Sequence, residues 1–333
     1  MFQTMQFGWA SLLGMAICTA APGSAGLGQP AISGPYTHDN LSIYLIHAAP
    51  GEERARFLTL GEALAQKKVV VYETSSVNEL AIENLSAETV YIQAGDIVKG
   101  GKQDRVFPID FLLVPNSGRV PIGAFCVEHG RWSRRGDEAS DRFNSSNRSV
   151  AFKDLKMAVV DGNDQSKVWS EVAAAQHGLA GVGAAPAASP SPSSMQLALE
   201  NRQVIDATKP YVRDLTGKME AHGDVVGFAY AVNGKLSGAD VYSSTSLFQR
   251  MWPKLIEASA TEAAAARGET GAAAPSAESV RRALIAADGG KDSGRTTGGR
   301  ASVERKDSDS ALLFETSVEG SGGAWIHKSY IVR

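Results

Sequence analysis

Charged residues and glycines concentrate in two short segments of the sequence whose chemistry suits an anionic ligand. The first is Gly-Gly-Lys-Gln-Asp-Arg, residues 100–105, and the second is Glu-His-Gly-Arg-Trp, residues 128–132. Paired glycines can adopt positive φ angles and turn successive N–H groups inward, which forms a concave site for phosphate or carboxylate. We therefore predict a pocket for an anionic small molecule, with these ligand-binding residues: Gly100, Gly101, Lys102, Gln103, Arg105, Arg131 and Trp132.

Four acidic residues near these segments are candidates for proton transfer, namely Glu73, Asp96, Asp104 and Glu128. Carboxylates gathered at one strand end could act as acid and base if burial separated their pKa values. Arginine partners would instead keep the same carboxylates ionised and structural. Trp132 has two interpretations as well, stacking on a ligand ring or packing at the rim of the core. The sequence leaves open whether the protein is an enzyme, and it indicates no particular reaction.

A predicted hairpin would position both segments. Residues 109–114 and 119–127 are apolar on both faces and are separated by Pro-Asn-Ser-Gly, which predicts a central, buried hairpin. A register without bulges would place Arg105 opposite Glu128. That pair could simply lock the two strands through a charge-assisted hydrogen bond, or it could belong to the anion pocket. Both interpretations remain open.

The remaining pattern of strands and helices indicates the fold class. Residues 68–73, 78–84 and 89–95 are strand-like runs joined by short loops, which predicts a meander in which Glu73 lies opposite Asn78. Residues 311–333 predict a final hairpin. Strands grouped without regular βαβ alternation predict an α+β fold with a mostly antiparallel sheet or sandwich, built from hairpins and flanked by helices. Helices are expected at residues 166–176, within 195–218, from 247 onward and at 276–287.

The N-terminal residues have the features of an export signal. Residues 7–22 form an apolar run that is too short to cross a bilayer comfortably, and small residues follow it. We predict a signal peptide over residues 1–25 and an exported protein, periplasmic or secreted, although the basic start of most signals is missing because no Lys or Arg precedes Arg54. A buried N-terminal helix and a wrongly chosen start codon are the alternatives.

Composition divides the rest of the chain. After a flexible leader at residues 26–40, residues 41–333 are predicted to form a single α+β domain. Low-complexity stretches predict flexible insertions at about 178–194 and 264–310. No later segment approaches membrane-spanning length, so no transmembrane segment is predicted after signal cleavage.

Charge and cysteine content exclude several classes of protein. The 333 residues include 33 Lys and Arg against 36 Asp and Glu, a net charge of -3, so a nucleic-acid partner is not expected. Hydrophobic residues make up 43% of the chain, which excludes global disorder. The two cysteines, Cys18 and Cys126, are too few for a disulfide framework or a four-cysteine zinc site. Cys126 lies on the apolar side of an alternating run and is expected to be buried and inert.

Familiar cofactor motifs are absent from the sequence. The six histidines form no HxH or HxxxH pair, so no sequence-local metal site is predicted, and only a scattered site stays open. No Walker A loop or GxGxxG fingerprint opens a helix after a strand, and no nucleophile elbow is found. The cofactor, if there is one, is unknown.

Several segments resemble a known family, the ARG and Rhodanese-Phosphatase-superfamily-associated Protein domain. The specific part is AGDIVKGGKQDR (94–105) with FCVEHGRW (125–132), and VYETSSVNELAIEN (71–84) accompanies it. Supporting segments, which extend the resemblance over most of the chain, are residues 167–172, 225–242, 247–263 and 325–330. The family is named for its gene neighbourhood beside ADP-ribosylglycohydrolases and rhodanese-phosphatases, so the resemblance implies a link to ADP-ribose or nucleotide-derived ligands. It supplies no established reaction, and the insertion at 178–194 and the export signal depart from the family's pattern.

Two functions from different classes follow. The first is an exported domain that binds, and could process, an anionic small ligand such as an ADP-ribose-like nucleotide derivative at the two motifs. The second is a non-catalytic envelope protein with a structural or interaction role, in which the same motifs only stabilise the fold. Protein partners are unknown in both cases.

Overall fold

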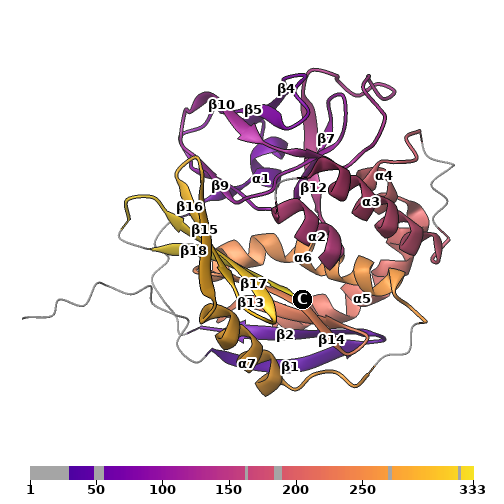
Figure 1. Cartoon of the computed structure of the whole chain (residues 1–333), viewed down its shortest axis with the longest axis vertical. Coiled ribbons are helices and arrows are strands. Elements are labelled where there is room, and N and C mark those ends of the chain that lie inside the picture. The colour runs from indigo at the N-terminus through magenta and orange to yellow at the C-terminus, as the bar shows by residue number, and fades with distance from the viewer. Residues whose placement is uncertain (1–29, 49–55, 162–163, 184–189, 269–271, 322–323) are drawn as a thin grey trace, which may run out of the picture.

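The computed structural model describes residues 30–48, 56–161, 164–183, 190–268, 272–321 and 324–333. A large sheet forms one part of the molecule, and three smaller sheets with short helices form the other (Figure 1). The predicted α+β fold with mostly antiparallel strands is confirmed. The helices are α1 (Leu60–Ala65), α2 (Lys153–Val160), α3 (Gln165–Ala180), α4 (Met195–Leu199), α5 (Arg202–Glu220), α6 (Thr245–Ala265) and α7 (Ala277–Asp288).

The large sheet has eight antiparallel strands. In spatial order they are β1 (Ala31–His38), β2 (Leu41–His47), β13 (Val225–Val232), β14 (Lys235–Tyr242), β18 (Trp325–Val332), β17 (Ala311–Val318), β16 (Ala301–Asp307) and β15 (Lys291–Gly298). The sheet therefore contains both the first and the last strand of the described chain, and most of its middle strands are buried. The final hairpin predicted at residues 311–333 is confirmed as β17 and β18.

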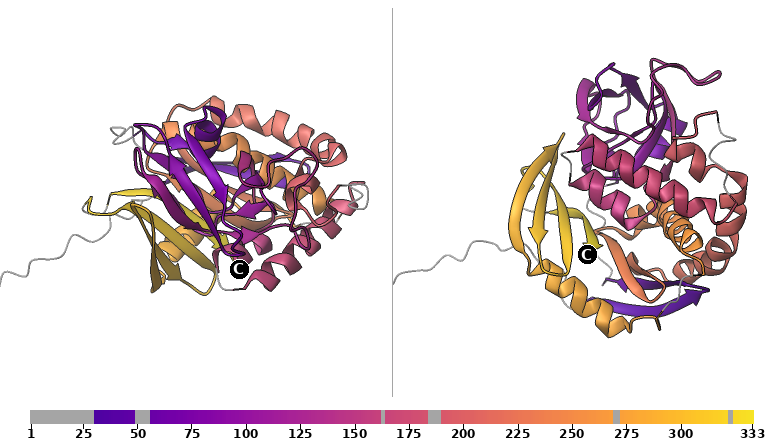
Figure 2. Two further views of the ribbon diagram at one scale, coloured as in Figure 1. Left: turned by 90° about the horizontal axis from the view of Figure 1, so that it is seen from above. Right: turned by 45° about the vertical axis from the view of Figure 1, so that its right-hand side comes forward.

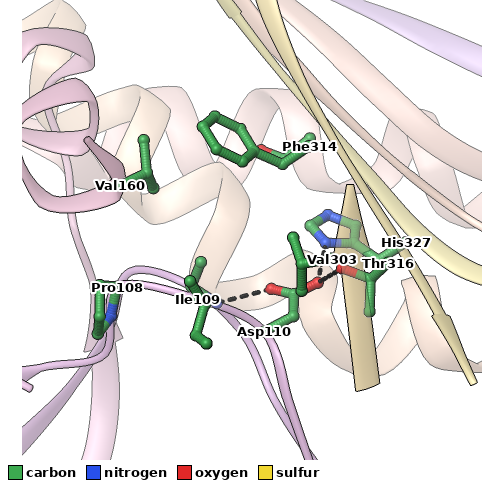
Figure 3. A pocket seen from close by; sticks show the side chains of 10 residues that line it. Pro108, Ile109, Asp110, Val160, Val303, Phe314, Thr316 and His327 are labelled. Atoms are coloured by element: carbon green, nitrogen blue, oxygen red, sulfur yellow. Dashed lines mark hydrogen bonds and ion pairs between the residues drawn. The ribbon is translucent and has the colours of Figure 1, made fainter. Parts of the chain in front are cut away.

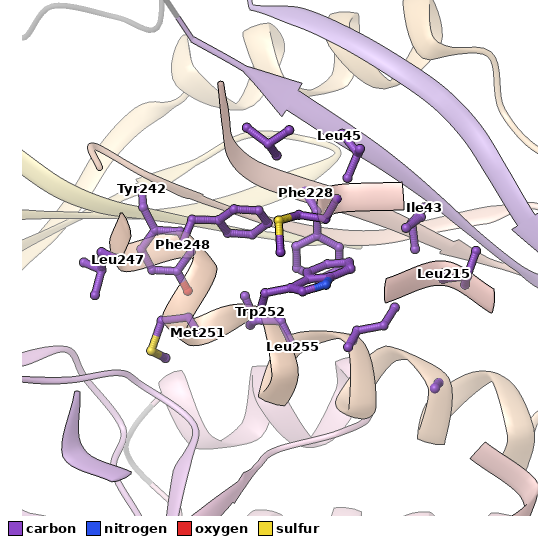
Figure 4. Packing of buried hydrophobic residues seen from close by; sticks show 14 of the residues in the cluster. Ile43, Leu45, Leu215, Phe228, Tyr242, Leu247, Phe248, Met251, Trp252 and Leu255 are labelled. Carbon is purple, nitrogen blue, oxygen red and sulfur yellow. The ribbon is translucent and has the colours of Figure 1, made fainter. Parts of the chain in front are cut away.

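Both faces of this sheet are covered by helices, which explains why nearly every residue of β2 is buried. Ile43 and Leu45 pack with α5 and α6 in one cluster, whereas the alternate residues Tyr44 and Ile46 pack with α7 in another. Figure 2 shows the sheet curving around α5 and α6, with α7 on its outer side. The inner cluster contains aromatic side chains from strand and helix in contact (Figure 4), and in it the rings of Phe228 and Trp252 meet edge to face at 5.3 Å.

Hydroxyl side chains cap the helices that cover the sheet. Ser244 caps α6 and Ser276 caps α7, each by accepting a hydrogen bond from a backbone N–H of the first turn. The helix expected at residues 276–287 is α7, and its cap is the first residue of that range. The helix expected from residue 247 is α6, which begins two residues earlier, at Thr245.

Three smaller sheets form the second part of the molecule. The first contains, in spatial order, β10 (Gly118–Gly123), β5 (Glu79–Asn84) and β4 (Val69–Glu73). The second contains β11 (Phe125–Cys126), β8 (Arg105–Val106), β7 (Asp96–Gly100) and β12 (Phe143–Ser149). The third contains β3 (Leu58–Thr59), β6 (Val90–Ile92) and β9 (Phe111–Leu113). Helix α1 contacts strands of all three sheets, and α2, α3 and α4 pack with the sheet that contains β7 and β8.

The predicted pairing of these short strands is only partly right. Strands β4 and β5 form the expected hairpin, but Glu73 lies opposite Leu80 rather than Asn78, and the third predicted strand joins a different sheet as β6. The predicted hairpin of residues 109–127 was wrong, because β9 pairs with β6 while β10 pairs with β5. Strand β10 is a half-exposed edge strand in which Pro121 needs no backbone partner, so apolar residues on both sides of a turn did not imply mutual pairing.

Some stretches predicted to be flexible hold regular structure. The predicted leader at 26–40 contains β1, and the predicted insertion at 264–310 contains β15 and β16 in addition to the expected helix, which is α7. Of the predicted insertion at 178–194, residues 184–189 lie outside the described residues, as does the predicted signal at 1–25. The division into a single domain stays a prediction. None of the described helices is both long and apolar enough to span a membrane.

Candidate functional site

The Gly-Gly-Lys-Gln-Asp-Arg segment forms the tight connection between β7 and β8. Both glycines have positive φ angles, 126° at Gly100 and 58° at Gly101, as the predicted anion site requires. The backbone N–H groups, however, bind carboxylates of the protein itself. Gly100 donates to Asp104 Oδ1 at 3.0 Å, and Lys102 donates to Glu73 Oε2 at 3.1 Å. The loop therefore has the expected conformation, and two of its inward N–H groups are already occupied.

Arg105 and Glu128 do not form the cross-strand pair that the sequence predicts. Strand β8 pairs with β11 so that Arg105 lies opposite Cys126, which shifts the register by two residues. The guanidinium of Arg105 donates to Cys126 Sγ at 2.7 Å, to the carbonyl oxygens of Ser76 and Val77, and to Glu73 Oε1 at 3.4 Å. The predicted register failed because it was extended from a hairpin that does not exist.

Glu128 instead forms a two-point ion pair with Arg131. Arg131 Nε and Nη2 each lie 2.6 Å from a carboxylate oxygen of Glu128, and the backbone N–H of Asp104 donates to Glu128 Oε2 at 2.9 Å. Arg131 also donates to the carbonyl oxygens of Gly100 and Gly101, at 3.2 and 2.9 Å. Because Arg131 bonds both segments, the two motifs meet in space as expected, through different atoms.

A second arginine, Arg135, neutralises Asp104. Its two terminal nitrogens lie 2.8 and 3.0 Å from the Asp104 carboxylate, and Ser194 Oγ donates to Asp104 at 2.6 Å. Arg135 also lies 3.3 Å from Glu128 Oε1. Ser194 was not predicted, since it ends a low-complexity tract whose composition carries no signal for a buried hydrogen bond.

Burial raises the pKa values of Asp104 and Glu128, whereas their arginine partners lower them. Burial raises the pKa of Asp104, and Arg135 only partly offsets this effect. Burial would also raise the pKa of Glu128, but hydrogen bonds from Arg131 and Ser191 hold it below the usual range. Asp104 is therefore the one of the two that more readily takes up a proton.

The predicted site residues divide into a buried and a solvent-facing set. Arg105 and Glu128 are 0% exposed, and Gln103 is buried with its amide donating to the Glu128 carbonyl at 2.8 Å. Trp132, in contrast, is 43% exposed, and Lys102 Nζ lies 5.2 Å from the centre of its ring. Among the predicted ligand-binding residues, Trp132 is thus the exposed one, and the partly exposed Lys102 lies beside it.

The fourth carboxylate candidate, Asp96, lies apart from this network. It sits at the opposite end of β7, where Lys254 Nζ of α6 donates to it at 2.8 Å. Glu73, Asp104 and Glu128 all bond the 100–105 loop, so the structure brings together three of the four predicted carboxylates.

Cys126 lies within the network and is buried, as predicted. Burial raises the pKa of its thiol to about 11, although the neighbouring Arg105 acts in the opposite direction. At neutral pH it is therefore a protonated thiol, which is a poor nucleophile.

A second cluster of buried charges was missed by the sequence reasoning. His327 of β18 lies between two carboxylates, with Nδ1 2.7 Å from Asp110 and Nε2 3.1 Å from Asp240 of β14. Lys156 of α2 contacts Asp240 at 3.2 Å. Burial alone would lower the pKa of His327, but the two carboxylates raise it to about 9. The imidazole is therefore charged at neutral pH.

A small pocket with a volume of about 10 Å³, enough for about one water molecule, adjoins this histidine. Figure 3 shows Asp110 and His327 on one side of it and apolar side chains, including Val160 and Phe314, on the other. The backbones of Gly298 and Asp110 pack closely beside it, since a side chain at residue 298 would collide with the carbonyl oxygen of Asp110. Both nitrogens of His327 are engaged by carboxylates, so the cluster is held as an ion network.

One signal in the sequence could have revealed this cluster. Asp240, His327 and Lys328 are ionisable residues in strand segments that are otherwise apolar or small, Leu-Ser-Gly-Ala-Asp-Val-Tyr and Trp-Ile-His-Lys-Ser-Tyr. Charged side chains in buried strands require partners, which makes them candidates for a network or a site.

Comparison with known proteins gives one match. No curated protein and no solved structure is significantly similar to this chain. The model of the ARG and Rhodanese-Phosphatase-superfamily-associated Protein domain matches residues 29–331, and this range includes both motifs and all the strands and helices up to the last strand. The chain therefore belongs to that family.

Proposed function

We propose that this protein binds an anionic small molecule that carries an aromatic ring, with ADP-ribose-like nucleotide derivatives as the ligand class. The proposed binding surface consists of Lys102 and Trp132. The Glu128–Arg131 ion pair and its neighbours hold these two residues in place. The single observation that carries this proposal is the exposed tryptophan ring beside a lysine ammonium group, 5.2 Å apart.

The ring and the charge have complementary roles in this proposal. An exposed indole face can stack on a nucleobase, and such stacking contributes about 1–3 kcal/mol per base in single-stranded nucleic-acid complexes. Lys102 Nζ donates to the hydroxyl of Ser75 at 2.8 Å, and within the described ranges it forms no ion pair with a carboxylate. Its charge is therefore available to a phosphate.

The buried ion pairs support the proposal by holding this surface rigid. Trp132 directly follows Arg131, whose guanidinium is bonded to Glu128 and to two carbonyl oxygens of the glycine loop. Lys102 is held in the same loop, through its backbone bond to Glu73. A binding group that is fixed before the ligand arrives loses less conformational entropy on binding.

Calorimetric titration of the full chain with ADP-ribose, ADP, AMP and ribose 5-phosphate tests the proposal. We expect binding of at least one ligand, weakened by Lys102→Ala and by Trp132→Ala. Arg134→Ala is the matched control, since Arg134 is a nearby exposed cation that is paired with Asp137 at 3.2 Å. Absence of binding by all four ligands, or equal binding by wild type and both variants, would contradict the proposal.

A second candidate function is a structural or interaction role in the cell envelope, without a small ligand. The observation in its favour is that Arg105 and Glu128 are fully buried and that the glycine loop binds the protein's own carboxylates. Under this alternative, Glu128→Gln would destabilise the protein while none of the four ligands bound to the wild type.

We also propose that the protein is exported, on the strength of the apolar run at residues 7–22 followed by small residues. Processing of residues 1–25 in a cell that exports the protein would be seen by N-terminal sequencing of mature material. Recovery of intact Met1 from all cell fractions would overturn the export proposal, without bearing on ligand binding.

A further inference from the structure

Two histidines and an aspartate meet at one end of the eight-stranded sheet, far in sequence from the glycine motifs. His47 is the last residue of β2, His222 follows α5, and Asp224 directly precedes β13. Pairing of β2 with β13 brings them together, since Val225 lies opposite His47 and the N–H of Ala48 donates to the carbonyl oxygen of Asp224. Neither the family nor the proposed ligand surface accounts for this cluster.

The distances within the cluster approach those of a metal coordination sphere. His47 Nδ1 lies 3.0 Å from Asp224 Oδ1, and one potential ligand atom from each of the three side chains lies within 4.8 Å of the other two. Metal–ligand bonds of about 2.0–2.2 Å place neighbouring ligand atoms roughly 3 Å apart. The His47–Asp224 pair already has this spacing, so only the His222 ring has to move closer.

The surroundings of the cluster hold His47 in place and allow the His222 ring to move. His47 Nε2 is hydrogen-bonded to Ser33 Oγ at 2.7 Å, and the hydroxyl of Tyr36 donates to the same Ser33 oxygen. A hydrogen bond at the far nitrogen is the usual way in which a metal-binding histidine is oriented. His222 is only partly buried and meets the His47 ring edge to face, with 5.3 Å between ring centres.

We propose that His47, His222 and Asp224 form a binding site for a divalent transition-metal ion of the Zn²⁺ type. Two imidazole nitrogens and one carboxylate oxygen are ligands that Zn²⁺ accepts, and three protein ligands leave at least one position for water. Asp224 is half-exposed, which gives the ion a path from solvent.

The chain contains a similar pair that provides a matched control. His38 Nδ1 lies 2.8 Å from Asp214 Oδ2, a pair much like His47 and Asp224. Its ring, however, packs edge to face against Tyr211, at 4.8 Å, where His47 has His222. Loss of His38 should therefore leave metal binding unchanged.

Calorimetric titration with ZnCl₂ tests the site, using the full chain without a histidine tag and freed of metal by a chelator. We expect one Zn²⁺ per chain, at least about tenfold weaker binding in His222→Ala and Asp224→Asn, and unchanged binding in His38→Ala. Zn²⁺ should also raise the melting temperature of the wild type, and much less that of His222→Ala.

Two results would overturn the proposal: no saturable Zn²⁺ binding to the wild type, or binding that His222→Ala and Asp224→Asn leave intact. Failure to fold is not a concern for interpretation, because both residues lie at the surface end of the sheet and metal-free melting curves would reveal a loss of structure in either variant.

Discussion

Asp110 and His327 are 217 residues apart in the chain and form a buried ion pair, with Asp110 Oδ2 2.7 Å from His327 Nδ1. The loop before β9 supplies the carboxylate and the last strand supplies the imidazole, so the pair ties the part of the molecule with three small sheets to the large sheet. Asp240 contacts the other ring nitrogen of His327, and Lys156 forms an ion pair with Asp240.

This pair makes the stability of the protein depend on pH. The pKa of His327 rises from 6.5 to about 9 on folding, so the stability contribution of its charged form is complete below pH 6.5 and is lost as pH rises through about 9. The size of the effect is on the order of 3 kcal/mol. Urea unfolding at several pH values should show a falling free energy of unfolding across this range.

His327→Gln is the variant that assigns this pH dependence. It retains hydrogen-bonding capacity but cannot titrate, so its free energy of unfolding should change much less between pH 6.5 and 9. An equal slope in the variant and the wild type would show that another group is responsible.

Loss of the Glu128 charge should destabilise the protein strongly. Glu128→Gln removes the buried charge that pairs with the nearly buried guanidinium of Arg131, and removal of one partner of a buried ion pair costs about 3–5 kcal/mol. Glu278→Gln is the control, because Glu278 pairs with Arg281 at the surface and such pairs contribute about 1 kcal/mol or less. Similar denaturation midpoints for both variants would disprove the importance of the buried pair.

Replacement of two glycines by alanine should separate backbone strain from steric collision. Gly101 and Gly118 have almost the same φ, 58° and 60°, and a left-handed conformation costs a non-glycine residue about 1–2 kcal/mol. A Cβ at Gly118 would meet nothing within 4 Å, whereas a Cβ at Gly101 would lie 2.5 Å from the Phe143 ring. Gly101→Ala should therefore lose about 1–3 kcal/mol more than Gly118→Ala in chemical denaturation.

Cys126 should be unreactive in the folded protein. Its thiol is buried and has a pKa of about 11, so the thiolate is scarce at pH 8. In a Cys18→Ser variant, in which Cys126 is the only cysteine, a thiol-labelling reagent should react slowly in buffer and rapidly in denaturant. Rapid labelling of the native variant would contradict the buried position.

The sequence alone determined those features that depend on neighbouring residues. The final hairpin, the helix that starts after Ser276 and the β4–β5 hairpin follow from turn residues, caps and periodicity, which act over a few residues. The conformation of Gly100 and Gly101 belongs to the same class, since paired glycines favour positive φ. The family was also recognisable, because its motifs are continuous in the sequence.

Only the tertiary structure decided which partners these residues have. Periodicity shows which face of a strand is apolar but does not show which strand pairs with it, so β9 and β10 were wrongly paired and Arg105 was placed opposite the wrong residue. Ion pairs between distant segments, such as Asp110 with His327, form only where sheet pairing and backbone packing bring their atoms within a few ångströms. No local pattern encodes that proximity, and the Coulomb energy that shifts these pKa values depends on it directly.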